Sequence, residues 1–244
     1  MRVTELWRYP VKSLQGERVP SGFLGVDGLE GDRRFAIFDA LTGLGLSGRR
    51  VPELLFGSAR ALPSGNVEIR TPDGTVAQDD AALSAWLGRP VTLRSTEDVA
   101  TRYYENVDDF ENEAGSWTPF EGATGSFRDS ERTAVSIVSV GSLKTWDRRR
   151  FRSNIVVDGS GEDALVGHRV SLGAAVLEVS KKVGRCVMVT RPQPGDIPKD
   201  LDVLRAVHRE RGGTLAIGAV VMFEGAVSVG DELFVGPVPS VVPL

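Results

Sequence analysis

Hydrophobic and polar residues alternate in short runs over residues 1–95, and turn-forming residues separate these runs. Short runs with a period of two are typical of β-strands, and frequent turn signals between them are typical of small barrels and sandwiches. Thr71-Pro72-Asp73-Gly74 is one such turn, because its proline and glycine suit the backbone angles that a turn requires. Strands are predicted here at residues 3–9, 18–24, 35–39, 58–62, 67–70 and 91–94.

One helix is predicted among these strands. Leu83, Trp86 and Leu87 are spaced by three and four residues, which places their apolar side chains on one helical face. Asp80 can cap the first turn, and Gly88 stands where a left-handed residue commonly ends a helix. The first part of the chain is therefore predicted to be mainly β with a single short helix.

A long polar segment follows at residues 96–132, rich in Gly, Ser and acidic residues and with little periodicity. A loop of this length is unusual inside one compact domain, so the segment is either a linker or a loop that covers a site. Its acidic side chains would make it a poor lid for an anion. We therefore predict a first domain at residues 1–95 and a second domain at residues 133–244, joined by this segment.

The second domain is also predicted to be mainly β. A helix is predicted at residues 202–211, ended by Gly212 and Gly213, and a shorter one at residues 141–149. The predicted fold class is therefore mainly β with few short helices. Strands are predicted at residues 135–140, 155–157, 175–180, 187–190 and 214–223, with a final pair around residues 229–231.

Composition narrows the classes of function. The chain has 244 residues, 41% of them hydrophobic, and a formal net charge of −4, which argues against general binding to nucleic acid or anionic membranes. No apolar run approaches the roughly 20 residues of a membrane helix. The first five residues also lack the layout of a secretory signal. We therefore expect a cytoplasmic protein with a small-molecule partner.

The chain has one cysteine, Cys186, and two histidines, His168 and His208. These counts exclude an intrachain disulfide, a structural zinc site and a protein-bound iron–sulfur cluster. A lone cysteine is most often a small buried side chain. Lysines and arginines flank Cys186, however, and a positive field favours the thiolate that attacks electrophiles or binds metals. The thiol can therefore be structural, nucleophilic or a metal ligand.

Two motifs in the first domain could bind an anion. In "WRYPVKSLQGE", Pro10 breaks a strand, and Lys12 and Ser13 then offer a cation beside a small hydroxyl. In "GLEGDRRFAIFD", a turn precedes a strand that opens with Arg33 and Arg34. Adjacent strand residues point to opposite faces, so only one of these arginines can face a given pocket. Ordinary solvated turns and strand edges have the same residue types.

A third motif, "FRSNIVVDG", places Arg152 and Asn154 on one face of a predicted strand. A guanidinium and a carboxamide that point into one cavity can recognise an anion and the edge of a heterocycle. Hydrolase chemistry has little support, because nothing local links a histidine to Cys186 and no nucleophile elbow is present. A Gly-rich phosphate loop is also absent from the sequence.

Taken together, six motifs in chain order resemble one family. The chain is similar to proteins with an N-terminal MOSC β-barrel followed by a MOSC domain, named after the C-terminal part of molybdenum cofactor sulfurase. The resemblance implies two β-barrel-like domains and covers nearly the whole chain, least of all residues 96–132. The motifs are "ELWRYPVKSLQGE", "GLEGDRRFAIFD", "ALSAWLGRPV", "SIVSVGSL", "FRSNIVVDG" and "RCVMVT".

Members of this family include the mitochondrial amidoxime reducing component, and they bind a molybdenum–pyranopterin cofactor (molybdopterin) between the two domains. The resemblance implies that Cys186 is the catalytic residue that ligates molybdenum. It also implies an oxidoreductase that reduces N-hydroxylated or N-oxide-type compounds with electrons from a separate electron-donor protein. Ser153 stands where relatives commonly have proline. The expected cofactor-binding residues are Lys12, Ser13, Arg33, Ser139, Arg152, Asn154 and Arg185.

Two further functions are compatible with these residues. A non-catalytic carrier would hold the cofactor, or a sulfur atom as a persulfide on Cys186, for delivery to another enzyme. A β-barrel binding module would simply bury the thiol. In each case we expect a small-molecule ligand and no nucleic-acid or membrane partner.

Overall fold

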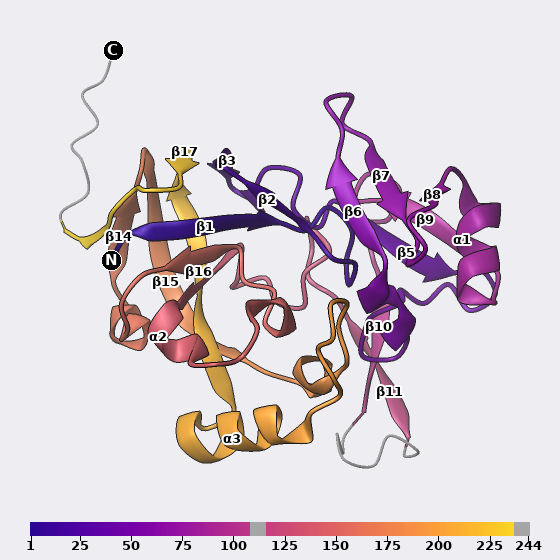
Figure 1. Cartoon of the computed structure of the whole chain (residues 1–244). Coiled ribbons are helices and arrows are strands. Elements are labelled where there is room, and N and C mark those ends of the chain that lie inside the picture. The colour runs from indigo at the N-terminus through magenta and orange to yellow at the C-terminus, as the bar shows by residue number, and fades with distance from the viewer. Residues whose placement is uncertain (108–115, 237–244) are drawn as a thin grey trace.

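The computed structural model describes residues 1–107 and 116–236 of the chain. They form two lobes that lie side by side, and strands make up most of the regular structure in each lobe (Figure 1). The larger lobe contains the first strand and most of the second half of the chain. The smaller lobe contains most of the remaining first half. The predicted mainly β fold with few short helices is confirmed.

An eight-stranded sheet organises the larger lobe. Leu6, Ile137 and Leu177 are fully buried in its apolar core, and the core residues of β15, Ala175, Leu177 and Val179, follow the predicted period of two. β12 and β13 run parallel, whereas the other neighbouring strands are antiparallel. In sheet order the strands are β18 (Leu233–Val235), β14 (Arg169–Leu172), β15 (Ala175–Gly184), β16 (Thr214–Phe223), β12 (Val135–Ser139), β13 (Ile155–Val157), β1 (Val3–Arg8) and β2 (Glu17–Val19).

The opening strands of the chain lie with its second half. β1 pairs with β13, with Leu6 opposite Ile155. A three-stranded sheet of β17 (Gly225–Ser228), β3 (Ser21–Gly25) and β4 (Gly28–Leu29) likewise joins early residues to late ones. The division of the chain into the predicted domains stays a prediction. The loop after β1 packs Val11 and Leu14 into the core of the smaller lobe, and the chain returns to the larger lobe at β2 before it enters the smaller lobe at β5 (Phe35–Asp39).

The smaller lobe packs two small sheets around its own core, in which Val11, Leu14, Leu54 and Leu83 are buried. A short 3₁₀ helix, η1, covers one end of this core. The elements are β5 (Phe35–Asp39) paired with β9 (Val91–Ser95), then β6 (Ser58–Ala61), β7 (Val67–Arg70) and β8 (Val76–Ala77) in one sheet, and η1 (Pro52–Phe56).

The predicted helix of this lobe is α1 (Asp80–Leu87). Its cap is Asp79 and not Asp80, because the Asp79 carboxylate accepts a hydrogen bond of 2.8 Å from the Ala82 backbone N–H. The Asp80 carboxylate instead accepts from the Leu93 N–H on β9. Gly88 ends the helix in the left-handed conformation, with φ of 64°, as predicted.

A hairpin of β10 (Tyr103–Val107) and β11 (Trp117–Glu121) lies in the polar segment that shows little periodicity. Tyr104 is fully buried, and its ring packs 5.9 Å from that of Phe120. The Gly45 N–H donates to the Tyr103 carbonyl, which ties the hairpin to the smaller lobe. Part of this segment is therefore regular structure attached to the first half of the chain.

The predicted helix at residues 141–149 is shorter than expected. α2 (Val140–Leu143) ends at Lys144, whose φ of 53° takes the backbone out of the helical region. A 3₁₀ turn, η2 (Arg148–Arg150), follows, and a second one, η3 (Glu162–Leu165), lies after β13. The basic run therefore sits on a separate short turn and not at the end of a continuous helix.

The predicted strand at residues 187–190 is wrong, since these residues form the 3₁₀ helix η4 (Val187–Thr190). The Arg150 guanidinium donates hydrogen bonds to the carbonyls of Val189 and Arg191. These carbonyls therefore have partners without a neighbouring strand. The predicted C-terminal helix is confirmed as α3 (Leu201–Arg211). None of the helices in the described part of the chain has the length and hydrophobicity that crossing a bilayer requires.

Candidate functional site

A cavity of about 380 Å³ lies between the two lobes. Its walls come from the loop after β1, the turn before β5, the loop before η1 and the ends of the large sheet. Of the eight residues predicted for the site, Ser139 is the one that does not line it. The structure brings together Lys12, Ser13, Arg33, Arg152, Asn154, Arg185 and Cys186.

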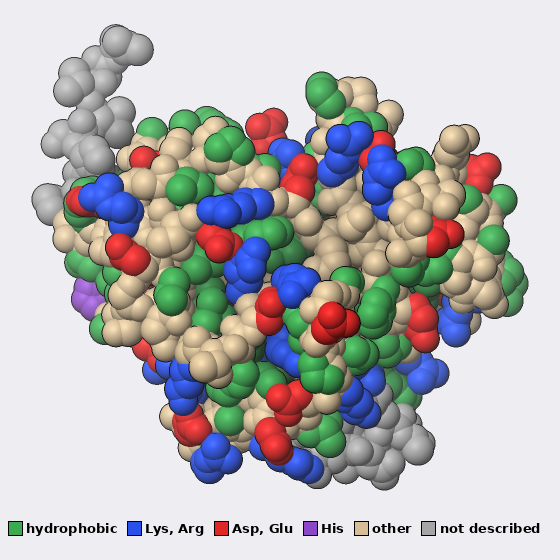
Figure 2. Space-filling view, in the orientation of Figure 1, with side chains coloured by type: hydrophobic (Ala, Val, Ile, Leu, Met, Phe, Trp, Pro, Cys, Tyr) green, Lys and Arg blue, Asp and Glu red, His purple; other side chains and the backbone are tan. Residues whose placement is uncertain are grey.

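The lining of this cavity, called the cation cavity below, is strongly basic. Seven of its described side chains are Lys or Arg, and Asp129 is the single acid among them. Figure 2 shows Lys and Arg side chains near the middle of the molecular face, where the lobes meet. In a chain with a net charge of −4, this concentration of positive charge indicates a site for an anionic ligand.

The loop after β1 carries Lys12, whose side chain is buried. Lys12 is only 7% exposed, and its Nζ donates to the Phe127 carbonyl at 3.2 Å and to the Asp129 carboxylate. Burial lowers the pKa of Lys12, and the Asp129 charge opposes that change. Ser13 has a φ of 71°, and its hydroxyl accepts a hydrogen bond from the Gly48 N–H. These hydrogen bonds hold the loop and its ammonium group at the cavity.

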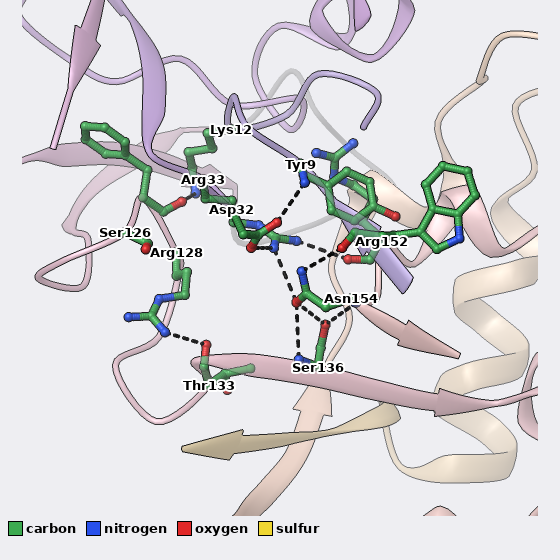
Figure 3. A network of polar contacts seen from close by, with 12 residues as sticks. Tyr9, Lys12, Asp32, Arg33, Ser126, Arg128, Thr133, Ser136, Arg152 and Asn154 are labelled. Carbon is green, nitrogen blue, oxygen red and sulfur yellow. Dashed lines mark hydrogen bonds and ion pairs between the residues drawn. The ribbon is translucent and has the colours of Figure 1, made fainter. Parts of the chain in front are cut away.

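The structure places Arg33 at the cavity and Arg34 outside it. Arg33 has a φ of 50° and precedes β5, so the chain turns here and no strand alternation separates the two side chains. The Arg33 guanidinium pairs with buried Asp32 and donates to the Arg152 carbonyl at 3.0 Å (Figure 3). Arg34 pairs with exposed Glu97 instead.

Asn154 ties two strands of the large sheet, β12 and β1, through its carboxamide. Its Oδ1 accepts from the Ser136 N–H and hydroxyl, and its Nδ2 donates to the Trp7 carbonyl at 3.2 Å (Figure 3). Asn154 and Arg152 both precede β13, so the predicted shared strand face is wrong, although both residues line the cavity. The Asn154 side chain therefore acts here mainly as a structural tie.

The Arg152 guanidinium is buried, and its terminal nitrogens make no hydrogen bonds to the described residues. The residue is only 4% exposed. Its guanidinium lies 4.4 Å from the centre of the Tyr9 ring, which supports it from one side. Burial lowers the pKa of Arg152 to about 10, so the group still carries its charge at neutral pH. An unpaired buried guanidinium is costly and is well suited to receive an anion.

Cys186 is partly exposed at the start of η4 and lines the cavity. Burial alone would lower the pKa of Arg49, but Asp129 and the Cys186 sulfur raise it above its ordinary value. Arg185 donates to the carbonyls of Leu215 and Phe151, and burial lowers its pKa to about 10. The Cys186 sulfur therefore interacts with two guanidinium groups, those of Arg49 and Arg185.

If the strand before Cys186 continued to it, alternation would place Lys182, Gly184 and Cys186 on one side. β15 ends at Gly184, so the alternation does not continue to the cysteine. Lys182 pairs with Asp163 and does not line the cavity, whereas Lys181 does. The irregular pairing between β15 and β16 explains this change of face, because each irregularity in register shifts the alternation.

Several cavity residues were not singled out by the sequence, and two of them, Arg49 and Asp129, carry charge close to Lys12. Arg49 comes from the loop before η1 and is 7% exposed, and Asp129 comes from the polar segment. The Asp129 carboxylate pairs with Lys12 and, at 2.7 Å, with Arg49. One acid of the segment that we expected to be a poor lid for an anion therefore lies in the cavity and pairs with its cations. A basic pair just before a proline, Arg49-Arg50-Val51-Pro52, was the available signal for Arg49.

Ser139 lies away from the cavity at the end of β12. Its hydroxyl donates to the fully buried Glu162 carboxylate and accepts from the Ser142 N–H at 3.1 Å, which caps α2. Its role in the structure is therefore to begin a helix and to satisfy a buried acid.

A second hollow of about 410 Å³ opens on the surface beside β3 and β4. Its acids are Asp27, Glu30, Asp32, Glu97 and Glu224, with Arg34 as the only cation among the described lining residues, and we call it the acidic hollow. It contains none of the predicted site residues. No group of three or more His, Cys, Asp or Glu side chains suited to a metal ion occurs within residues 1–107 and 116–236.

Comparison with protein families gives two matches in chain order. The family described as the MOSC N-terminal beta barrel domain matches residues 1–114, and the MOSC domain family matches residues 125–234. A search of the curated proteins finds no match for this chain. The two family matches together cover both lobes and every residue predicted for the site.

Solved structures give more distant similarities. The YuaD protein from Bacillus subtilis is 16% identical, with 95% of this chain and 93% of that chain covered and a TM-score of 0.47. YiiM from Geobacillus stearothermophilus is 20% identical over 43% of this chain and 55% of that chain, with a TM-score of 0.34. YiiM from Escherichia coli is 17% identical over 45% and 57%, with a TM-score of 0.33.

Proposed function

Because the chain belongs to the MOSC-domain proteins, with a MOSC N-terminal barrel followed by a MOSC domain, we propose that its cation cavity binds a molybdenum–pyranopterin cofactor. We further propose an oxidoreductase that reduces N-hydroxylated or N-oxide-type compounds. Electrons would come from a separate donor protein, since the sequence provides too few cysteines for an iron–sulfur relay. The single observation that carries this proposal is the partly exposed sulfur of Cys186 in the cation cavity.

The donor set of the cavity fits such a cofactor. Cys186 is one soft ligand, and the described residues offer no other cluster of metal ligands around it. A metal here would therefore need its remaining ligands from a bound group, such as the dithiolene of a pterin. The bound cofactor would supply a redox-active metal able to accept an oxygen atom from substrate. The protein itself would supply the thiolate and the binding charges.

The phosphate of the cofactor requires cationic partners, and the cavity provides cations that are already buried at its wall. Arg152 has two buried terminal nitrogens without partners among the described residues, and Lys12 and Arg49 are buried on loops. Charge-assisted hydrogen bonds from such groups are stronger than those from solvated side chains. Arg33 and Asn154 are already paired within the protein, so we expect them to position the wall of the cavity.

Arg185 would contribute a fixed positive charge beside the Cys186 sulfur. Two backbone carbonyls fix its guanidinium beside Cys186, and its second terminal nitrogen is buried without a partner among the described residues. This position keeps a positive charge beside the sulfur that we propose as the metal ligand. It also leaves one N–H for a hydrogen bond to a bound group.

Metal analysis of protein made in a host that synthesises the cofactor tests the proposal. We expect about one molybdenum per chain, loss of most of it in Cys186→Ser, and retention in Met188→Leu, which removes the other sulfur of the cavity. Turnover of an N-hydroxylated compound with an artificial electron donor should follow the molybdenum content. A chain that contains no molybdenum, and whose Cys186→Ser variant behaves like the parent protein, would contradict the proposal.

A carrier function shares the same cavity and would give a different result. The described lining contains no His and no Glu, so groups that commonly transfer protons in catalysis are few. Mass spectrometry of the native protein distinguishes the two functions. A stable persulfide on Cys186, without turnover of any N-hydroxylated compound, would favour the carrier.

A further inference from the structure

Asp129 holds an unusual place in the cation cavity. It is the single acid among the described lining residues, and its two carboxylate oxygens contact different cations. Oδ1 pairs with Lys12 Nζ, and Oδ2 lies 2.7 Å from Arg49 Nη2. A carboxylate that bridges an ammonium and a guanidinium makes the same contacts that a phosphate oxyanion would make there.

The three partners differ sharply in exposure. The side chains of Lys12 and Arg49 are 8% and 9% exposed, whereas that of Asp129 is 50% exposed. The cations are therefore fixed inside the cavity, and the carboxylate reaches them from the solvent side. Lys12 and Arg49 together hold the pKa of Asp129 below its usual range despite its partial burial, so the group is charged at neutral pH.

The chain around Asp129 is anchored on both sides but not at the residue itself. Phe127 is fully buried, and its N–H donates to the Arg33 carbonyl at 2.7 Å. The Ala134 N–H donates to the Ala219 carbonyl on β16. Between these anchors, rotation of the Asp129 side chain toward solvent would break two ion pairs without disturbing either apolar core.

We propose that Asp129 is an intramolecular stand-in for a phosphate group, which occupies the anion position between Lys12 and Arg49 in the ligand-free protein and leaves when phosphate binds. It relieves the repulsion between buried cations while no ligand is present. It also sets specificity, because an entering anion must replace two ion pairs and therefore needs more than one negative charge. The inference rests on the proposed function only in naming the cofactor's phosphate as the natural ligand.

Phosphate titration tests this exchange directly. Full-length protein from a host that cannot make the cofactor would be titrated calorimetrically with inorganic phosphate at about pH 8. We expect Asp129→Asn to bind phosphate about tenfold more tightly than the parent protein, because the competing charge is gone. Glu131→Gln removes an equal charge two residues away and should leave phosphate affinity unchanged. Affinity that is unchanged or weaker in Asp129→Asn would overturn the proposal and assign Asp129 a purely structural role.

Loss of stability in the variant does not prevent the test. Asp129→Asn should melt at a lower temperature, but added phosphate should raise its melting temperature more than it raises that of the parent protein. An equal or smaller rise would count against the exchange. Adding Arg49→Met to Asp129→Asn should remove the gain in affinity. If the gain persists, phosphate binds elsewhere and the proposal is wrong.

The outcome is independent of the proposed function. A protein that never contains molybdenum would contradict the cofactor assignment and would leave the phosphate titration unaffected. Conversely, a molybdenum-containing protein whose Asp129→Asn variant gains no phosphate affinity would contradict the exchange alone.

Discussion

Two cavities of nearly equal size, about 380 and 410 Å³, lie in the same molecule and differ in how their polar groups are satisfied. In the cation cavity, Lys12, Arg49 and Arg152 are buried, and the terminal nitrogens of Arg152 lack hydrogen-bond partners among the described residues. In the acidic hollow, Asp27 and Glu97 are 64% and 74% exposed and pair with arginines. Volume therefore does not distinguish a binding site from a surface depression here.

The two cavities differ in the free-energy cost of the charges that line them, because some charges are buried in one and exposed in the other. A buried guanidinium without partners destabilises the folded protein unless a ligand restores its hydrogen bonds. Water satisfies the exposed acids of the hollow at little cost. We infer that the cation cavity is organised for a ligand and that the hollow needs none, and the following predictions test that contrast.

The largest effect is expected at the wall between the two cavities. Asp32 lines the hollow, is 3% exposed, accepts from the Tyr9 N–H at 2.8 Å and pairs with Arg33 on the cavity side. Asp32→Ala should lower the free energy of unfolding by about 3–5 kcal/mol, because Arg33 and the Tyr9 N–H lose their shared partner. Urea denaturation measures this change.

The matched control for Asp32 is the exposed pair beside it. Glu97→Ala removes the partner of Arg34 and should change the free energy of unfolding by less than about 1 kcal/mol. Similar losses in the two variants would show that the wall is no more tightly organised than the surface. The contrast between the cavities would then fail.

The second effect has the opposite sign. Arg152→Met should raise the free energy of unfolding of ligand-free protein by about 1–2 kcal/mol, because an unpaired buried charge is replaced by an apolar side chain. It should also weaken phosphate binding about tenfold or more. Arg148→Met is the control, since Arg148 also lies over an aromatic ring, that of Trp7, but pairs with Glu5. If Arg152→Met lowers stability, the buried charge is not the liability that we infer.

The same residues show what could be predicted from the sequence. Alternation predicts the strands well, and residues 35–39, 67–70, 155–157 and 214–223 are strands with the expected bounds. Charge and spacing also indicate Lys12 and Arg152, because cations after a broken strand or beside a buried strand are few. Strand alternation and the position of a cation beside a strand depend on residues that are close in the chain, so they can be predicted from the sequence alone.

The parts that the sequence did not predict depend on distant contacts. Arg33 and Arg152 line the cavity because their φ angles are 50° and 53°, which non-glycine residues rarely adopt and alternation cannot indicate. Asp129 reaches Arg49 across 80 residues of sequence. The backbone after Cys186 forms a 3₁₀ helix, and Arg150 donates to the carbonyls of Val189 and Arg191, which an apolar run of three residues does not reveal.

A smaller effect is expected from pH. Burial lowers the pKa of Arg152 and of Arg185 to about 10, and an anion would favour their charged forms. Binding should therefore take up protons near pH 10, and affinity should fall as pH rises from about 8 to about 11. Calorimetry with sulfate, which does not titrate in this range, in buffers of different ionisation enthalpy measures the uptake. Binding that is independent of pH would show that these arginines do not contact the anion.

The smallest effect is expected in the acidic hollow. Asp27→Asn with Glu224→Gln removes two of its charges, and each side chain is exposed. The free energy of unfolding should change by less than about 1 kcal/mol and phosphate affinity in the cation cavity by less than about twofold, because solvent screens charges at this distance. Denaturation and phosphate titration of the same variant measure both quantities. A large gain in phosphate affinity would mean that the two cavities form one electrostatic unit, and that burial of charge is not what separates them.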